Sequence, residues 1–436
     1  MPVVTQTSRG LVRTIGRCSL VALMINMIIG GSILRLPSIL AARLDAWSPL
    51  TCLVAGAGML VIAGCIAEVS SRYDETGGLY LYARDAFGRF VGLLVGWLTW
   101  LTRIAAPAAA ANLFCTFAAQ FVPAIGTRRG ELVVLALLIG QLALFNYIGV
   151  KSGKNLSNVF TAAKVSVLVF FVVAGAIALI FRPEIRVPLH TPPTSLKDWL
   201  EPMLILVYAY GGFEGALFVG GETTNPRRDI PIALLIALVA VGAIYAAIQL
   251  VTIATLPDVA NSVRPLSDAA QRFLGPAGAT FMGIGALVSM YGYLSANLLS
   301  VPRITFALGE HGDFPRFFAA IHPKYHTPYV SIALYAVVLF LFAAFGTFQW
   351  NAILSAVSRL AVYGAMAVAV PVLRRRHDGK AQFLLPFPYF FSVVGVLFAL
   401  VLMTRMGRGE FLALAATCII AFSNWIAVKS NRSHTT

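Results

Sequence analysis

Apolar residues gather into long runs along the whole chain, and short polar segments separate one run from the next. Most runs hold about 18 to 28 residues, enough for a helix to cross a hydrocarbon core of about 30 Å at about 1.5 Å per residue. The pattern therefore predicts an all-α integral membrane protein with twelve transmembrane helices. We place these spans at residues 13–42, 47–71, 89–122, 131–150, 155–181, 198–221, 231–256, 276–302, 328–347, 350–373, 386–406 and 409–428.

Glycine interrupts the first and the sixth predicted span close to their midpoints. The first reads "NMIIGGSILRLPS" at residues 26–38, and the sixth reads "YAYGGFEGALF" at residues 208–218. The two glycine pairs are offset by 211 − 30 = 181 residues. Glycine in a membrane helix also lets neighbouring helices approach closely. The matching positions favour broken helices, as in transporters built from inverted repeats.

A second pair of segments supports the same internal repeat. Residues 82–92 follow the second span and residues 267–278 follow the seventh, and both read as short amphipathic helices. Five spans separate the two segments, an odd number, so the two halves have opposite orientations in the membrane. We expect one membrane domain over residues 1–436, with inverted repeats at 13–181 and 198–373 and two additional helices at 386–428.

Each break leaves N–H and C=O groups that cost several kcal/mol apiece unless a ligand, water or ion meets them. Free N–H groups in the first span suit a carboxylate, and free carbonyls in the sixth span suit an ammonium group. An α-amino acid carries one group of each kind. The predicted substrate-binding residues are Gly30, Gly31, Ser32, Tyr210, Gly211, Gly212 and Phe213.

Three of these side chains have specific expected roles. Phe213 can close over the substrate as an aromatic lid or pack against helices or lipid, and Tyr210 is a weaker candidate for the same role. The Ser32 hydroxyl can donate to the carboxylate or bond back to its own helix.

Composition agrees with a membrane protein, because 58% of the residues are hydrophobic, 12% are charged and the mean hydropathy is +0.81. The net charge of +15 lies mostly in short inner loops such as "RRRHDGK" at 374–380, which anionic lipid head groups explain more simply than nucleic acid. With a cytoplasmic N-terminus, inner segments carry about twice as many Lys and Arg residues as outer loops. We therefore expect a multi-pass protein of the cell membrane with both termini in the cytoplasm.

The candidate chemistry argues against an enzyme. No predicted span carries Gly-x-Ser-x-Gly opposite a His, paired Asp residues or His-Glu-x-x-His. The five cysteines have no paired spacing, and the six histidines form no metal motif. We expect no enzymatic activity, no metal site and no cofactor.

Four segments resemble those of a known family: "IIGGSILRLP", "ETGGLYLYARDAFG", "YGGFEGALFVGGETTNPRRDIP" and "VPRITFALGEHGDFPRFFAAIHPKYHTP". Over nearly its whole length the chain resembles the amino acid permeases of the APC (amino acid, polyamine and organocation) superfamily. The resemblance implies a leucine-transporter-like five-plus-five inverted repeat with broken helices 1 and 6 around the substrate. The family's first-span loop usually reads Gly-Ser-Gly or Gly-Ala-Gly, whereas this chain has Gly30-Gly31-Ser32, so the side chain at position 32 bears on substrate size.

Lys164 lies nine residues past Asn155 in the fifth predicted span, about 13 Å along the helix and near mid-depth. Burial disfavours the charged form of an amine, which suits a group that exchanges a proton. In several proton-coupled permeases of the superfamily a fifth-span lysine stands where sodium-coupled relatives hold sodium. The resemblance implies that role for Lys164, with Ser289 of the eighth span as its polar neighbour. The alternative is a lysine that snorkels to the cytoplasmic surface.

Four further charged residues within the spans are candidates for gating or for an intramembrane charge network: Arg35, Arg103, Glu214 and Arg359. Arg35 follows the first break and resembles the outer-gate arginine of sodium-coupled neurotransmitter transporter relatives. Glu214 can pair with Arg103 or with Arg359. Such pairs are more often structural, and one that breaks and re-forms would mark a conformational switch.

The favoured hypothesis is a secondary active transporter of amino acids or related amines that works by alternating access with proton coupling. The alternatives are an amino acid or polyamine exchanger without net proton coupling and, from another class, a transport-dead amino acid sensor or scaffold. The expected partners are the small-molecule substrate, protons and the lipid bilayer, without nucleic acid. Apart from Glu214, no anionic residue is evident in the expected side-chain pocket, which favours neutral substrates, while Arg103 admits acidic ones.

Overall fold

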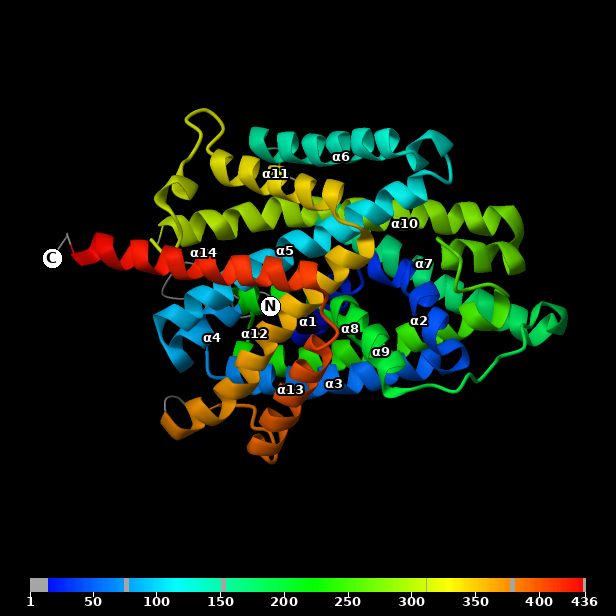
Figure 1. Cartoon of the computed structure of the whole chain (residues 1–436), viewed down its shortest axis with the longest axis horizontal. Coiled ribbons are helices and arrows are strands. Elements are labelled where there is room, and N and C mark those ends of the chain that lie inside the picture. Colours follow the sequence, from blue (N-terminus) through cyan, green and yellow to red (C-terminus); the bar gives the residue numbers. More distant parts are fainter. Residues whose placement is uncertain (1–14, 74–77, 150–153, 311, 377–380, 434–436) are drawn as a thin grey trace, which may run out of the picture.

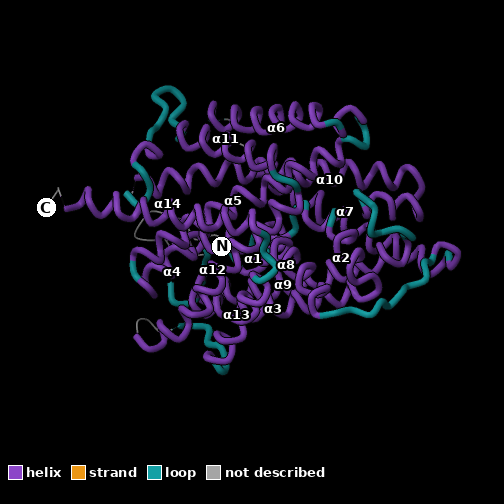
Figure 2. Tube along the Cα trace, viewed as in Figure 1, coloured by secondary structure: helices purple, strands orange, loops and turns teal. Residues whose placement is uncertain are grey.

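The computed structural model describes residues 15–73, 78–149, 154–310, 312–376 and 381–433, and nearly all of them are helical (Figure 1). Figure 2 shows the same bundle with helices joined by loops and turns. The α-helices are α1 (Arg17–Ile28), α2 (Leu36–Leu44), α3 (Ser48–Ser70), α4 (Gly78–Phe87), α5 (Arg89–Ala118), α6 (Arg128–Ile148), α7 (Lys154–Phe181), α8 (Leu196–Tyr210), α9 (Pro226–Thr255), α10 (Pro265–Glu310), α11 (Tyr329–Phe345), α12 (Phe348–Arg376), α13 (Pro388–Met403) and α14 (Arg408–Ser433).

Eight helical stretches in the described part of the chain are long and apolar enough to cross a membrane. They are Leu36–Ser70, Arg89–Ala118, Arg128–Ile148, Lys164–Phe181, Pro226–Thr255, Pro265–Glu310, Phe348–Arg376 and Arg408–Ala427. Shorter apolar helices, α1, α11 and α13, accompany them. Large apolar side chains such as Leu137 and Ile180 are exposed on the outside of the bundle, as contact with lipid requires. The chain is an all-helical, multi-span membrane protein.

The two broken segments lie within the main hydrophobic core. Buried side chains of α1, α3, α8, α9 and α12 form this core, and Met24, Met59, Leu204, Val241 and Met366 are its fully buried representatives. Helices α6 and α11 instead run side by side along one edge of the molecule, where a second apolar cluster joins them (Figure 1). The outer helices therefore shield a centre that contains α1 and α8.

The two short amphipathic segments expected after the second and seventh spans are helical, with a glycine at the end of each. Helix α4 ends at Phe87, and Gly88, with φ 89° and ψ 177°, separates it from α5. The first part of α10 ends at Gly275, with φ 71° and ψ −166°, before the long helix continues. The expected ranges 82–92 and 267–278 ran past these turns, because glycine at positive φ ends a helix that the apolar pattern alone would continue.

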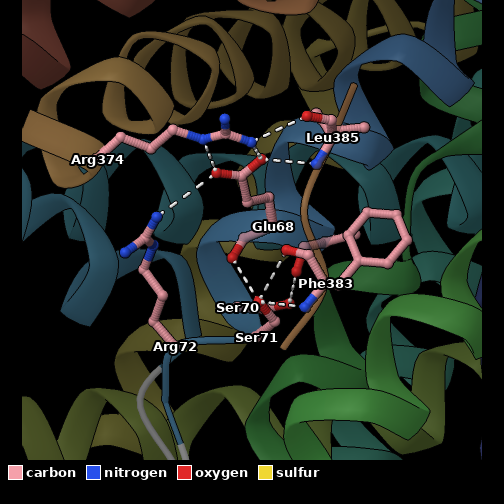
Figure 3. Close-up of polar contacts among 8 residues, drawn as sticks. Glu68, Ser70, Ser71, Arg72, Arg374, Phe383 and Leu385 are labelled. Carbon is pink, nitrogen blue, oxygen red and sulfur yellow. Dashed lines mark hydrogen bonds and ion pairs between the residues drawn. The ribbon is translucent and has the colours of Figure 1, made fainter. Parts of the chain in front are cut away.

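A buried carboxylate joins the C-terminal ends of α3 and α12 (Figure 3). Glu68 is fully buried and accepts two hydrogen bonds from the Arg374 guanidinium, at 2.6 and 2.7 Å. The backbone N–H of Leu385 donates to the same carboxylate at 2.9 Å, and Arg72 lies 3.5 Å from it. Glu68 therefore fixes both α12 and the chain that follows it, a role that no sequence pattern indicates.

We expect Glu68→Ala to lower the free energy of unfolding by about 3 kcal/mol, because it leaves buried donors on Arg374 and Leu385 without an acceptor. The exposed pair of Arg128 and Glu131 supplies the control, and Glu131→Ala should cost about 0 to 1 kcal/mol. Thermal unfolding of the detergent-purified variants measures both. Equal losses of stability in the two variants would contradict this role for Glu68.

Candidate functional site

The first glycine pair interrupts the first span inside the bundle. Helix α1 ends at Ile28, and the N–H of Ile29 makes the last helical hydrogen bond, 2.9 Å from the carbonyl of Ile25. In the part of the chain that the structure describes, the N–H groups of Gly30 and Gly31 donate to no backbone carbonyl. The chain then resumes as a 3-10 turn and as α2. Two main-chain donors just before this 3-10 turn are thus left without a backbone acceptor.

The second glycine pair ends α8 in the same way. Gly211 follows the last residue of α8, and Gly212 adopts φ 118°, a conformation that a residue with a side chain rarely takes. The N–H of Gly212 donates to a carboxylate oxygen of Glu214 at 2.8 Å. A 3-10 helix, Phe213–Glu222, continues the span. The sixth span therefore changes from α-helix to 3-10 helix at its glycines.

The two breaks lie against each other. A Cβ atom on Gly212 would stand 2.2 Å from the carbonyl oxygen of Met27, so the backbones meet without room for a side chain. The hydroxyl of Tyr245, from α9, lies 3.4 Å from the carbonyl oxygen of Ile28 and 3.2 Å from that of Ala209. Tyr245 bridges the ends of both helices. The sequence reasoning missed this residue, because a lone tyrosine in an apolar span carries no distinguishing pattern.

A basic side chain meets the carbonyl end of each broken helix. Lys164 of α7 donates to the carbonyl of Asn26 in the last turn of α1. Arg359 of α12 donates to the carbonyl of Tyr208 in the last turn of α8, at 3.2 Å. Cations stabilise this end of a helix because its carbonyl dipoles point toward them. A Cβ atom on Gly211 would stand 1.3 Å from an Arg359 nitrogen, so glycine is needed there.

Glu214 pairs with Arg359, one of the two partners that the sequence left open. An Arg359 nitrogen lies 3.2 Å from the Glu214 carboxylate, and both side chains are buried. The Tyr363 hydroxyl donates to the second carboxylate oxygen at 3.1 Å. The Phe213 ring stacks on Tyr363 with centroids 5.5 Å apart. The predicted lid residue and the charge pair thus share one partner helix, α12.

Arg103 of α5 is the remaining guanidinium near the breaks. A Cβ atom added to Gly215 would lie 3.0 Å from an Arg103 nitrogen and 2.9 Å from the Met27 sulfur, so both side chains pack against this glycine. Its main-chain carbonyl accepts a hydrogen bond from Tyr335 at 2.7 Å. Arg103 is half-buried and forms no ion pair with a carboxylate of the described residues. It therefore faces the second break without the partner that Arg359 has.

Two predicted substrate residues make their contacts with neighbouring helices. Tyr210 is fully buried, donates to the carbonyl of Cys52 at 2.7 Å and packs on Gly56 of α3. Its ring contacts both α3 and Tyr245 of α9, whose ring centroid is 5.4 Å away, and its role as a lid stays a prediction. Ser32 is buried and faces the Tyr245 hydroxyl. Position 32 therefore supports the bridge between the helices.

Lys164 and Ser289 lie at one level of two antiparallel helices. Phe171 of α7 lies beside Phe273 of α10, and Val167 packs on Gly285, so rising numbers in α7 oppose falling numbers in α10. Lys164 lies three residues before Val167 in α7, and Ser289 lies four residues after Gly285 in α10. Because the helices are antiparallel, the two side chains come at about the same level. Both side chains are buried, and the hydrogen bond recorded for Lys164 goes to α1.

Polar contacts close the bundle on each side of the breaks. Toward the predicted outside, Arg35 donates to the carbonyl of Ser262 and borders a polar cavity of about 190 Å³. Toward the predicted inside, Arg17 pairs with Asp229 at 2.8 Å, joining the start of α1 to α9. Arg35 thus contacts the loop before α10, a partner that the sequence did not identify because it is a main-chain carbonyl.

The described residues form no group of three or more His, Cys, Asp or Glu side chains that could hold a metal ion. The cations at the breaks are amino acid side chains, and the free groups are main-chain amides. Such a site suits an organic ion.

Comparison with known families and proteins extends this picture to the whole chain. A family model described as "Amino acid permease" matches residues 15–423. A methylthioribose transporter of Bacillus subtilis is 28% identical to this chain, over 97% of this chain and 92% of that protein. A serine/threonine exchanger, SteT, of the same bacterium is 28% identical over 90% and 91%. An arginine/agmatine antiporter of Chlamydia pneumoniae is 25% identical over 92% and 87%.

We expect Gly212→Ala to impair ligand binding on the order of tenfold or more, because its Cβ would push the Met27 carbonyl away and separate the two breaks. Gly140→Ala is the matched control, since nothing lies within 4 Å of its added Cβ. Ligand-induced shifts of the melting temperature in purified protein measure both. Unchanged binding in Gly212→Ala would show that contact between the breaks is dispensable.

Proposed function

Because the chain belongs to the amino acid permease family, whose members are transporters and not enzymes, we propose that it is a secondary active transporter of amino acids or related amines. In this proposal the substrate binds between the two helix breaks and is exposed to each side of the membrane in turn. The observation that carries the proposal is the contact between the breaks, with the N–H groups of Gly30 and Gly31 free beside them.

The substrate carboxylate would bind the free N–H groups at the first break, where the start of α2 adds a favourable dipole. The ammonium group would bind main-chain carbonyls near the second break. Arg359 and Tyr245 already donate to the carbonyls of Tyr208 and Ala209. The ammonium group would therefore bind a carbonyl of the residues that follow Ala209. Phe213, which stacks on Tyr363, would cover the bound substrate from the side of α12.

An inverted five-plus-five repeat is part of this proposal, and three matched features support it. The glycine pairs are offset by 181 residues, counted from Gly30 to Gly211. Gly88 and Gly275 have similar positive-φ conformations after the second and seventh spans. The fifth-span Lys164 binds the end of α1, as the tenth-span Arg359 binds the end of α8. We place both termini in the cytoplasm of a cell-membrane protein on the distribution of basic residues.

Proton coupling is the finer part of the proposal, with Lys164 as the carrier. A protonated Lys164 donates to the Asn26 carbonyl and steadies the end of α1, so loss of the proton weakens the hold on the first break. The break could then rearrange when the proton leaves. Exchange without net proton movement is the second candidate, because an exchanger and an antiporter are among the relatives. The third alternative, a sensor that binds without transport, predicts no flux.

We expect Lys164→Met to abolish uptake driven by an imposed pH gradient while counterflow of substrate survives, because the substituted side chain carries no proton but leaves the substrate groups in place. The exposed Lys197, changed to Met, is the control and should behave as the wild type. Both assays use purified protein in liposomes. Gradient-driven uptake in Lys164→Met at the wild-type rate would exclude coupling through this lysine, and binding without any flux in the wild type would favour the sensor.

A further inference from the structure

Arg103 is a positive charge placed deep in the membrane. It lies midway along the 30-residue α5 and is half-buried beside the second break. A charged side chain at this depth is costly to bury in the membrane, so it is normally paired, hydrated or functional. Its position next to Gly215 and Met27, at the meeting point of the two breaks, puts it where the substrate is proposed to bind.

The hydrogen bonds and the ion pair of Glu214 go to groups other than Arg103. One oxygen of Glu214 is held by Arg359, and the other accepts from Tyr363 and from the N–H of Gly212. Within the described residues, no side-chain hydrogen bond or ion pair is recorded for the Arg103 guanidinium, and its Nε atom is buried without a partner. Arg359 and Arg103 together carry two positive charges against the single negative charge of Glu214, so one positive charge of this group is uncompensated.

This excess charge indicates the class of substrate. A zwitterionic amino acid with a neutral side chain has no net charge and leaves Arg103 uncompensated when it binds. An amino acid with a carboxylate side chain carries one net negative charge and cancels it. A guanidinium also suits this task better than an ammonium group, because its planar fork can hold both oxygens of a carboxylate.

We propose that Arg103 binds the side-chain carboxylate of the substrate and that the transporter prefers acidic amino acids. The inference rests on the proposed function, because it places the α-carboxylate and ammonium group of the substrate at the breaks. The sequence favoured a neutral substrate, because no anionic residue apart from Glu214 was evident in the side-chain pocket, and admitted an acidic one through Arg103; the inference chooses the acidic substrate. In the structure Glu214 pairs with Arg359 and accepts a hydrogen bond from Tyr363, both of α12, and Arg103 has no such carboxylate partner among the described residues.

The test compares substrates that differ in charge and hardly in shape. L-glutamate and L-glutamine, and L-aspartate and L-asparagine, are titrated against the detergent-purified full chain, and the rise in melting temperature gives each Kd. We expect the wild type to bind each acid more tightly than its amide. Arg103→Gln should weaken glutamate binding on the order of 10- to 100-fold and leave glutamine within about threefold, as expected for loss of one charged hydrogen-bonded pair.

Two further variants make the result decisive. Arg103→Lys keeps the positive charge and loses the planar guanidinium, so its affinity for glutamate should lie between the affinities of the wild type and Arg103→Gln. If Arg103→Gln folds poorly, a reduced affinity in Arg103→Lys still tests the role of the guanidinium. The exposed Arg129, changed to Gln, is the control for removing a positive charge and should bind glutamate as the wild type does.

The outcomes separate the two proposals. If the wild type binds glutamine or other neutral amino acids as well as glutamate, the acidic preference is wrong and amino acid transport stands. If glutamate is preferred and Arg103→Lys and Arg103→Gln both keep that preference, the role of Arg103 is wrong. If no amino acid raises the melting temperature of the wild type, the proposed function itself fails.

Discussion

The structure depends on how it satisfies the carbonyl groups where two helices end inside the membrane. Lipid tails offer no hydrogen bonds, so each unpaired carbonyl there costs several kcal/mol. The chain supplies Lys164 to the end of α1, Arg359 to the end of α8 and the Tyr245 hydroxyl to both. These three donors come from α7, α12 and α9. The breaks are therefore stable only within the assembled bundle.

Charge follows from the same constraint. Once Arg359 is buried at the end of α8, it needs a counter-ion, and Glu214 supplies one two residues after the glycine turn. The same carboxylate holds the Gly212 N–H and Tyr363, so the charge pair also shapes the second break. Amide N–H groups at the first break and the Arg103 guanidinium are left over. These groups have no partner among the described residues, so they are the ones we expect a ligand to bind.

The sequence revealed the breaks and left their partners hidden. Glycine pairs marked both interruptions because only glycine allows the positive φ of Gly212 and the close approach to Met27. The donors were harder to predict, because Lys164, Arg359 and Tyr245 bind main-chain carbonyls, and a carbonyl looks the same at every residue. The choice of Arg359 over Arg103 for Glu214 depends on how α12 packs. Glu68 escaped notice because its partners, Arg374 and the N–H of Leu385, lie 306 and 317 residues further along the chain.

The central claim is that the two breaks together form the substrate site. Cryo-electron microscopy of the full chain in lipid nanodiscs, with a saturating amount of the amino acid that most raises its melting temperature, tests it most directly. The account predicts ligand density between residues 29–32 and 208–213, with the carboxylate at the first break. Density for the ligand elsewhere, or continuous helices through both glycine pairs, would contradict it.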